Sequence, residues 1–139
     1  MVLNSSQKDK VTFSQYLRNS IIEIEGLMLI EINGPSKEVL FRVISEGFDE
    51  PALEEMLISQ VYEIFDGLDK LEIEQSKRIT TIYGAMQIIQ FREGPYFGTV
   101  IAESYSNCGQ LHGMSNNISR ALGDLINFEE SWKRYADDH

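Results

Sequence analysis

The sequence predicts a single α+β domain with the element order α-β-β-α-β-β-β-α and a five-stranded, mainly antiparallel sheet flanked by helices. Three observations lead to this fold class. Apolar residues recur at helical spacing in three long segments, short β-type runs lie between these segments, and glycine-containing turns join the runs. A length of 139 residues fits one domain. We expect this domain to span residues 12–132, after a disordered lead-in at 1–11 and before a frayed tail at 133–139.

The first helix is predicted from Phe13 to Ile24, where apolar side chains recur every three or four residues. Thr12 can cap its N-terminus, with Gln15 in the capping-box position three residues later. Gly26 then suits the left-handed conformation in which many helices end. This segment therefore has its own start and stop signals.

A β-hairpin is predicted next, because the runs Leu27–Ile32 and Val39–Ser45 flank the dense turn signal Asn33-Gly34-Pro35-Ser36. The first run is apolar on both faces except at Glu31. A strand of that kind is typical of a central position in a sheet that is covered on both sides.

The second helix, from Leu53 to Leu68, is apolar around more of its circumference than a helix lying on one sheet needs. One stripe consists of Leu53, Leu57, Val61, Ile64 and Leu68. Met56 widens the stripe on one side, and Ile58, Tyr62 and Phe65 extend it on the other. Two interpretations stay open: the extra apolar face lies under a loop, or it forms a subunit interface.

Three more strands are predicted between Ile79 and Glu103, separated by Gly84 and by a turn at Glu93-Gly94-Pro95. A last helix from about Leu111 closes the domain. Its apolar stripe consists of Leu111, Met114, Ile118, Ala121, Leu122, Leu125, Phe128 and Trp132.

Composition excludes several classes of function. With 22 acidic and 12 basic residues the formal net charge is -10, which disfavours binding to nucleic acid phosphates. The single cysteine, Cys108, allows no internal disulfide, so a reducing compartment fits best. No apolar run approaches the roughly 20 residues that cross a bilayer. We therefore expect a cytoplasmic protein that does not insert into membranes.

Catalytic groupings are nearly absent. His112 follows Cys108 by four residues and would share its helix face, but no third residue is evident to orient the pair. Glycine-rich phosphate loops are missing, and adjacent carboxylates such as Glu54-Glu55 point in different directions on a helix. The residues predict no catalytic site, no cofactor and no metal site, and they leave the role of Asn116-Asn117 open.

A family resemblance adds to this interpretation. The run from Ile24-Glu25-Gly26 through the apolar strand to Asn33-Gly34 resembles the opening of the roadblock/dynein light-chain family, in which a short helix ends at a glycine and enters the first strand. The long second helix, the three-strand meander and the closing helix match that family in order over residues 12–128. The resemblance implies a roadblock/profilin-like fold.

Roadblock-like proteins are non-enzymatic dimers that bind small Ras-like GTPases or scaffold larger complexes, and their dimers typically join through the third strand and the long helix. The resemblance thus implies a homodimeric interaction module that binds and regulates or scaffolds a small GTPase. The interface residues expected on this basis are Ile58, Tyr62, Phe65, Ile79, Thr81 and Tyr83.

Two other functions stay open. The first is a small-molecule-sensing domain of the PAS or GAF kind, whose pocket would be lined by Met86, Ile88, Tyr96 and Phe97. The second is an enzyme that uses Cys108 as its nucleophile.

Overall fold

The fold predicted from the sequence is the fold observed. The computed structural model describes residues 5–46, 48, 51–70 and 78–138, and among them the side chains of residues 12–46, 48, 53–68, 70 and 78–126. Its elements follow in the predicted order: α1 (Ser5–Glu23), β1 (Leu27–Asn33), β2 (Val39–Ile44), α2 (Pro51–Lys70), β3 (Arg78–Tyr83), β4 (Met86–Glu93), β5 (Tyr96–Glu103) and α3 (Cys108–Asp138).

The five strands form one antiparallel sheet in the order β2-β1-β5-β4-β3. Strand β1 lies between β2 and β5, as its apolar sequence predicts. The two ends of the sheet are β2 and β3, each of which pairs with a single neighbour among the described strands.

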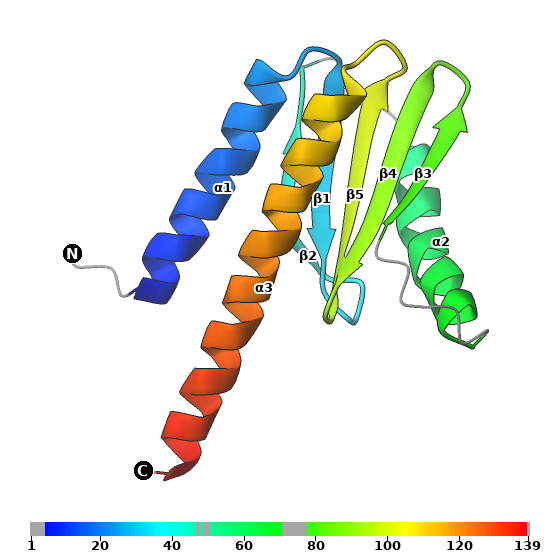
Figure 1. Ribbon diagram of the computed structural model, residues 1–139. Coiled ribbons are helices and arrows are strands. Elements are labelled where there is room, and N and C mark those ends of the chain that lie inside the picture. The colour runs from blue at the N-terminus through cyan, green and yellow to red at the C-terminus, as the bar shows by residue number, and fades with distance from the viewer. Residues whose placement is uncertain (1–4, 47, 49–50, 71–77, 139) are drawn as a thin grey trace.

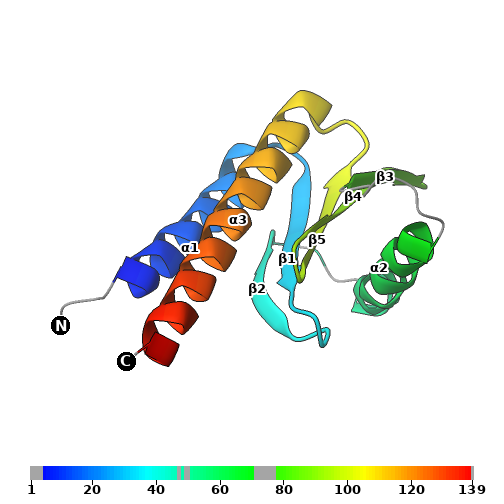
Figure 2. The same ribbon diagram turned by 60° about the horizontal axis from the view of Figure 1, so that its bottom comes forward.

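Helices cover both faces of the sheet (Figures 1 and 2). On one face α1 and α3 enclose the larger apolar cluster, which includes Leu17, Ile30, Ile89, Val100 and Ile118. On the other face α2 packs on a smaller cluster of Leu29, Leu53, Leu57, Ile88 and Ile101. The helix α2 is therefore held by a less extensive apolar contact than the α1–α3 layer.

The ends of two helices differ from the prediction. The helix α1 begins at Ser5, so Thr12 lies inside it and does not cap it, and the backbone of residues 5–11 is helical where a disordered lead-in was predicted. This stretch contains neither Gly nor Pro, and Gln and Lys favour a helix without any apolar stripe.

At the other end of the chain, α3 starts at Cys108 and continues to Asp138, through the predicted tail. Asn107 caps its first turn, because the Asn107 Oδ1 atom accepts a hydrogen bond from the Gln110 amide at 3.0 Å. The last part of α3 extends beyond the sheet (Figure 1).

Candidate protein-interaction surface

Strand β3 is an edge of the sheet among the described strands, and it carries large apolar side chains that are exposed to solvent. Ile82 is 68% exposed and Tyr83 is 54% exposed. Alternation along the strand directs Tyr83 to the α2 face and Ile82 to the α3 face. Soluble proteins usually guard such edges with charges or prolines, and only Arg78 carries a charge in this strand. Strand β3 is therefore suited to pairing with another chain.

The helix α2 adds apolar surface beside this edge. Leu53, Leu57, Val61 and Phe65 point into the protein, whereas Met56 and Ile64 are exposed. Helical spacing places Met56 and Ile64 on the side of α2 away from Tyr62, which contacts Gly34. The carbonyl of Leu57 accepts a hydrogen bond from Gln90 Nε2 of β4 at 3.0 Å. We define the β3–α2 surface as Met56, Ile64, Ile79, Thr81 and Tyr83.

One predicted interface residue does not reach the surface. Phe65 is fully buried within the single chain. Its ring lies 6.0 Å from the ring of Phe97, and the Arg92 guanidinium lies 5.2 Å from its centre. The prediction that Phe65 faces a partner is wrong, because Phe65 is one of the residues that attach α2 to β5.

The other five predicted residues fall into two separate groups. Ile79, Thr81 and Tyr83 lie on β3, at one edge of the sheet. Tyr62 lies at the other side of α2, where its hydroxyl donates to the carbonyl of Gly34 at 2.5 Å and its ring packs 4.1 Å from Phe97.

Ile58 belongs with Tyr62, because helical spacing places the two side chains on one stripe of α2 with Glu54, which contacts β2. The six residues therefore do not form one continuous surface. The sequence prediction missed Met56 and Ile64 as surface residues, because it placed Ile64 in the same stripe as the buried Leu57 and Val61, with Met56 beside that stripe.

A row of polar side chains crosses the sheet beneath α2. Arg42 of β2 pairs in register with Glu31 of β1, Glu31 with Thr99 of β5, and Thr99 with Gln90 of β4. Except for Arg42, these side chains are buried. We call these four residues the polar row, and α2 lies across it.

One arginine joins α2 to the polar row. The guanidinium of Arg42 donates two hydrogen bonds to the Glu54 carboxylate of α2, at 2.6 and 2.8 Å, and its Nε atom lies 3.6 Å from Glu31 Oε1. Hydrogen bonding from Arg42 lowers the pKa of Glu54. Burial, and then the neighbouring Glu54, raise the pKa of Glu31 to about 7 against the opposing effects of Arg42 and Asn33.

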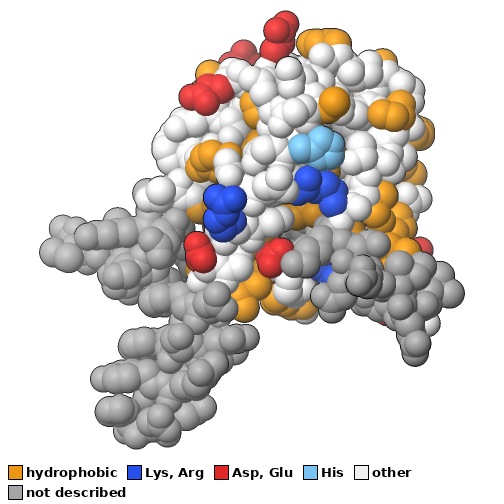
Figure 3. Space-filling view, viewed as in Figure 1, with side chains coloured by type: hydrophobic (Ala, Val, Ile, Leu, Met, Phe, Trp, Pro, Cys, Tyr) orange, Lys and Arg blue, Asp and Glu red, His pale blue; other side chains and the backbone are white. Residues whose placement is uncertain are grey.

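The two asparagines of α3 have structural roles that the sequence could not assign. Asn116 accepts a hydrogen bond from the Arg78 guanidinium of β3, and Asn117 donates to the Tyr16 hydroxyl of α1 at 3.0 Å. Arg78 also lies 3.1 Å from Nδ1 of His112, and Figure 3 shows the histidine against a basic side chain.

The Cys108 thiol is exposed. Because Nδ1 of His112 faces an arginine, which can only donate hydrogen bonds, this ring nitrogen acts as the acceptor for Arg78. The geometry gives no support to a pair in which this nitrogen activates the thiol.

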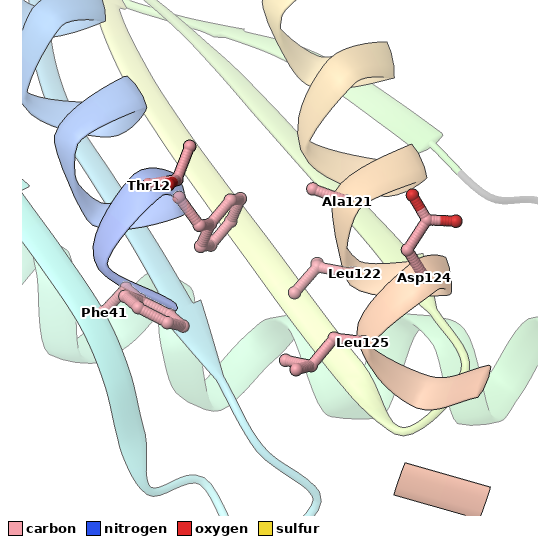
Figure 4. A pocket seen from close by; sticks show the side chains of 7 residues that line it. Thr12, Phe41, Ala121, Leu122, Asp124 and Leu125 are labelled. Carbon is pink, nitrogen blue, oxygen red and sulfur yellow. The ribbon is translucent and has the colours of Figure 1, made fainter. Parts of the chain in front are cut away.

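The proposed sensor pocket does not form from the predicted residues. Tyr96 belongs to the cluster beneath α1 and α3, whereas Ile88 and Phe97 lie on the α2 face with Met86 packed beside them. A cavity of about 230 Å³ lies instead between α1 and α3 (Figure 4). This cavity is smaller than the roughly 300–1,000 Å³ of typical ligand sites, whereas two more open hollows, of about 540 Å³ beside Met28 and about 490 Å³ beside Phe97, are within that range. The lining of the cavity between α1 and α3 consists of Thr12, Phe13, Phe41, Ala121, Leu122, Asp124 and Leu125.

Within the described parts of the chain, no helix has the length and apolar character to cross a membrane. No group of three or more His, Cys, Asp or Glu side chains is placed to hold a metal ion among these same residues.

Sequence comparisons connect the chain with a family of interaction proteins. The profile of the family described as "Mitogen-activated protein kinase kinase 1 interacting" matches residues 10–128. The Ragulator complex protein LAMTOR3-B of Xenopus laevis is 30% identical over 116 residues, which cover 84% of this chain and 89% of that protein. The Ragulator complex protein LAMTOR3 of Tetraodon nigroviridis is 26% identical over 111 residues, which cover 80% of this chain and 90% of that protein.

Solved structures share the fold. The gliding protein MglB of Thermus thermophilus has a TM-score of 0.67 at 10% identity and covers 90% of this chain and 93% of its own. A roadblock/LC7 domain from Streptomyces avermitilis has a TM-score of 0.53 at 6% identity and covers 87% of this chain and 97% of its own. The predicted likeness to the roadblock fold is thereby confirmed.

Proposed function

Because this chain belongs to the mitogen-activated protein kinase kinase 1 interacting family, we propose that it works as a subunit that pairs with a second roadblock-type domain through the β3–α2 surface. The simplest partner is a second copy of the chain. The chain is a non-catalytic interaction protein, as predicted, in keeping with relatives that are named for a complex and for an interaction.

The open edge of β3 is the observation that carries this proposal. Pairing two β3 strands would satisfy backbone groups that a single chain leaves to water, and it would continue the sheet from one subunit into the next. The same movement would bring the exposed Met56 and Ile64 of each α2 toward the partner. Edge pairing therefore gives the extra apolar surface of α2 a place to be buried.

We further propose that the pair binds a small Ras-like GTPase and localises or regulates it, as the roadblock resemblance implies. A stable complex of this kind buries roughly 1,200–2,000 Å² in total and depends on a few apolar or aromatic anchors. The net charge of -10 favours a partner with a basic patch, so association should slow as salt rises.

Capture from the native host at low salt, followed by mass spectrometry, tests the GTPase proposal. Recovery of a Ras-like GTPase with the wild-type protein, and its loss when the captured complex is washed with high salt, supports the proposal. Recovery of a protein kinase kinase without a GTPase would replace it with a kinase scaffold. A saturable small molecule with no protein partner would favour the sensing function.

A further inference from the structure

The buried carboxyl of Glu31 is an unusual feature of the α2 face. Its side chain is 1% exposed and lies in β1, an inner strand of the sheet, beneath the helix that contributes Met56 and Ile64 to the β3–α2 surface. Its Oε2 atom has no hydrogen-bond partner among the described residues, and neither do two neighbouring buried oxygens, Asn33 Oδ1 and Thr99 Oγ1. Buried oxygens without partners are costly, and a protein rarely retains several together.

The charges facing Glu31 come from two elements. Strand β2 contributes Arg42, and α2 contributes the Glu54 carboxylate and the Tyr62 phenol. The other neighbours of Glu31, Asn33 and Thr99, are uncharged. One guanidinium therefore lies between two carboxylates, one on the sheet and one on the helix.

We propose that Glu31 is a proton-sensitive switch that sets how firmly α2 is held on the sheet and thereby controls pairing through the β3–α2 surface. The first half of this inference stands on the geometry of the polar row. The second half rests on the proposed pairing function.

When Glu31 is neutral, Arg42 is free to bind Glu54 with both of its hydrogen bonds, which is the arrangement observed. The added proton also lets Glu31 donate a hydrogen bond to an oxygen nearby. When Glu31 is ionised, a second buried negative charge faces Glu54 and competes with it for Arg42. The Arg42–Glu54 pair then weakens, and with it the attachment of α2 to β2.

The other contacts that hold α2 on the sheet do not offset the repulsion between the ionised Glu31 and Glu54. The Leu57 carbonyl accepts a hydrogen bond from Gln90, the Tyr62 hydroxyl donates to the Gly34 carbonyl, and the rings of Tyr62 and Phe65 lie against Phe97; none of these contacts involves a carboxylate. The apolar cluster under α2 is the smaller of the two in the protein. Loosening of α2 would disorder Met56 and Ile64 while leaving the α1–α3 face intact.

Hydrogen exchange of the α2 amides, corrected for the intrinsic effect of pH, tests the first half directly. In the wild type, the protection of residues 53–68 should fall by up to about tenfold between pH 6 and pH 8, because the neutral form of a group with a pKa of about 7 becomes that much rarer. Glu31→Gln should keep α2 protected at both pH values. Glu55→Gln, an exposed carboxylate on the same helix, should retain the pH dependence. Protection of α2 that is independent of pH in the wild type would overturn the switch.

Titration of the wild-type Glu31 carboxyl by carbon NMR keeps the test valid if Glu31→Gln fails to fold. A midpoint near 7 supports the switch, and a midpoint near 4.5 overturns it. The dissociation constant of the pair, measured by sedimentation over the same pH range, tests the second half. A constant that rises up to about tenfold with pH supports control of pairing.

Loosening of α2 without any change in pairing would overturn that control and leave the switch in place. A chain that never pairs would contradict only the proposed function. Hydrogen exchange of α2 and titration of Glu31 can be measured equally well in a monomer.

Discussion

Gly98 of β5 lies directly opposite Phe91 of β4, and the aromatic ring occupies the space that a side chain at position 98 would need. Phe91 is almost completely buried in the cluster beneath α1 and α3. The absence of a Cβ atom at Gly98 lets the tip of this ring lie over the neighbouring strand, so the packing at the centre of the sheet depends on glycine at this position.

Gly98→Ala should destabilise the protein by about 1–3 kcal/mol, because the Phe91 ring must leave its position to admit a methyl group. Chemical denaturation measures the loss. Gly113→Ala is the matched control, since nothing lies within 4 Å of a Cβ atom at that position of α3. We expect it to stabilise the protein by about 0.5–1 kcal/mol through helix propensity. Equal effects of the two changes would show that the Phe91 ring imposes no constraint.

Stability should fall as the pH rises from 6 to 8. A carboxyl whose pKa is higher in the folded than in the unfolded chain stabilises the fold below its unfolded value and loses that contribution as the pH passes the folded value. Glu31 has a folded pKa of about 7 against an ordinary value of 4.5. The free energy of unfolding should therefore drop by about 1 kcal/mol between these pH values, and Glu31→Gln should remove the drop. Urea denaturation of both proteins at the two pH values is the measurement.

The contribution of Glu54 to stability changes with pH in the opposite direction. Its pKa is lowered by Arg42, so its contribution is present above the unfolded value and is lost as the pH falls through the acidic range. The two carboxyls together place the greatest stability of the α2 attachment near pH 4.5, where Glu54 is ionised and Glu31 is still neutral in the folded chain, and the stability falls between pH 4.5 and 7. A stability maximum above pH 8 would contradict this assignment.

Phe65→Asp should unfold the domain and not merely separate a pair. A charge at this buried position would lie in apolar surroundings beside Phe97, and Arg92 already lies over the ring that it would replace. We expect a loss of at least about 3 kcal/mol, as for an aromatic side chain removed from a core. Circular dichroism at increasing temperature distinguishes the two outcomes. A folded monomer with an unchanged melting temperature would show that Phe65 contributes to the interface and not to the core.

Cys108→Ser should leave stability and partner binding within about 0.5 kcal/mol of the wild type, since the thiol is exposed and His112 is engaged by Arg78. Thermal melts and the pairing constant provide the comparison. A large loss of any activity in this variant would revive the nucleophile hypothesis.

The order of elements could be predicted from the sequence because each signal is local. The glycine at position 26 has a φ of 86°, as the helix stop requires, and the apolar run with a lone Glu31 does form a central strand. The start of α1 was missed because polar helix formers leave no periodic pattern.

The arrangement of the candidate surface could be predicted only in part. Helical spacing shows that α2 has an excess of apolar residues, but it does not show which side of the stripe meets the sheet, and Phe65 was placed on the wrong side. The polar row depends on the register of β2, β1, β5 and β4. Register is set by tertiary packing, so no local pattern brings Arg42, Glu31, Thr99 and Gln90 into one line.

The mass of the chain in solution, compared between Tyr83→Asp and Tyr105→Asp, tests the central claim most directly. Both tyrosines are exposed, by 54% and 68%, but Tyr83 lies on β3, whereas Tyr105 lies in the turn before α3 with its ring beside Gly26, where α1 meets β1. Light scattering should give twice the chain mass of 15.9 kDa for the wild type and Tyr105→Asp, and a monomer for a folded Tyr83→Asp. A wild-type monomer at micromolar concentration, or a Tyr83→Asp protein that pairs as tightly as the wild type, would contradict pairing of identical chains through β3.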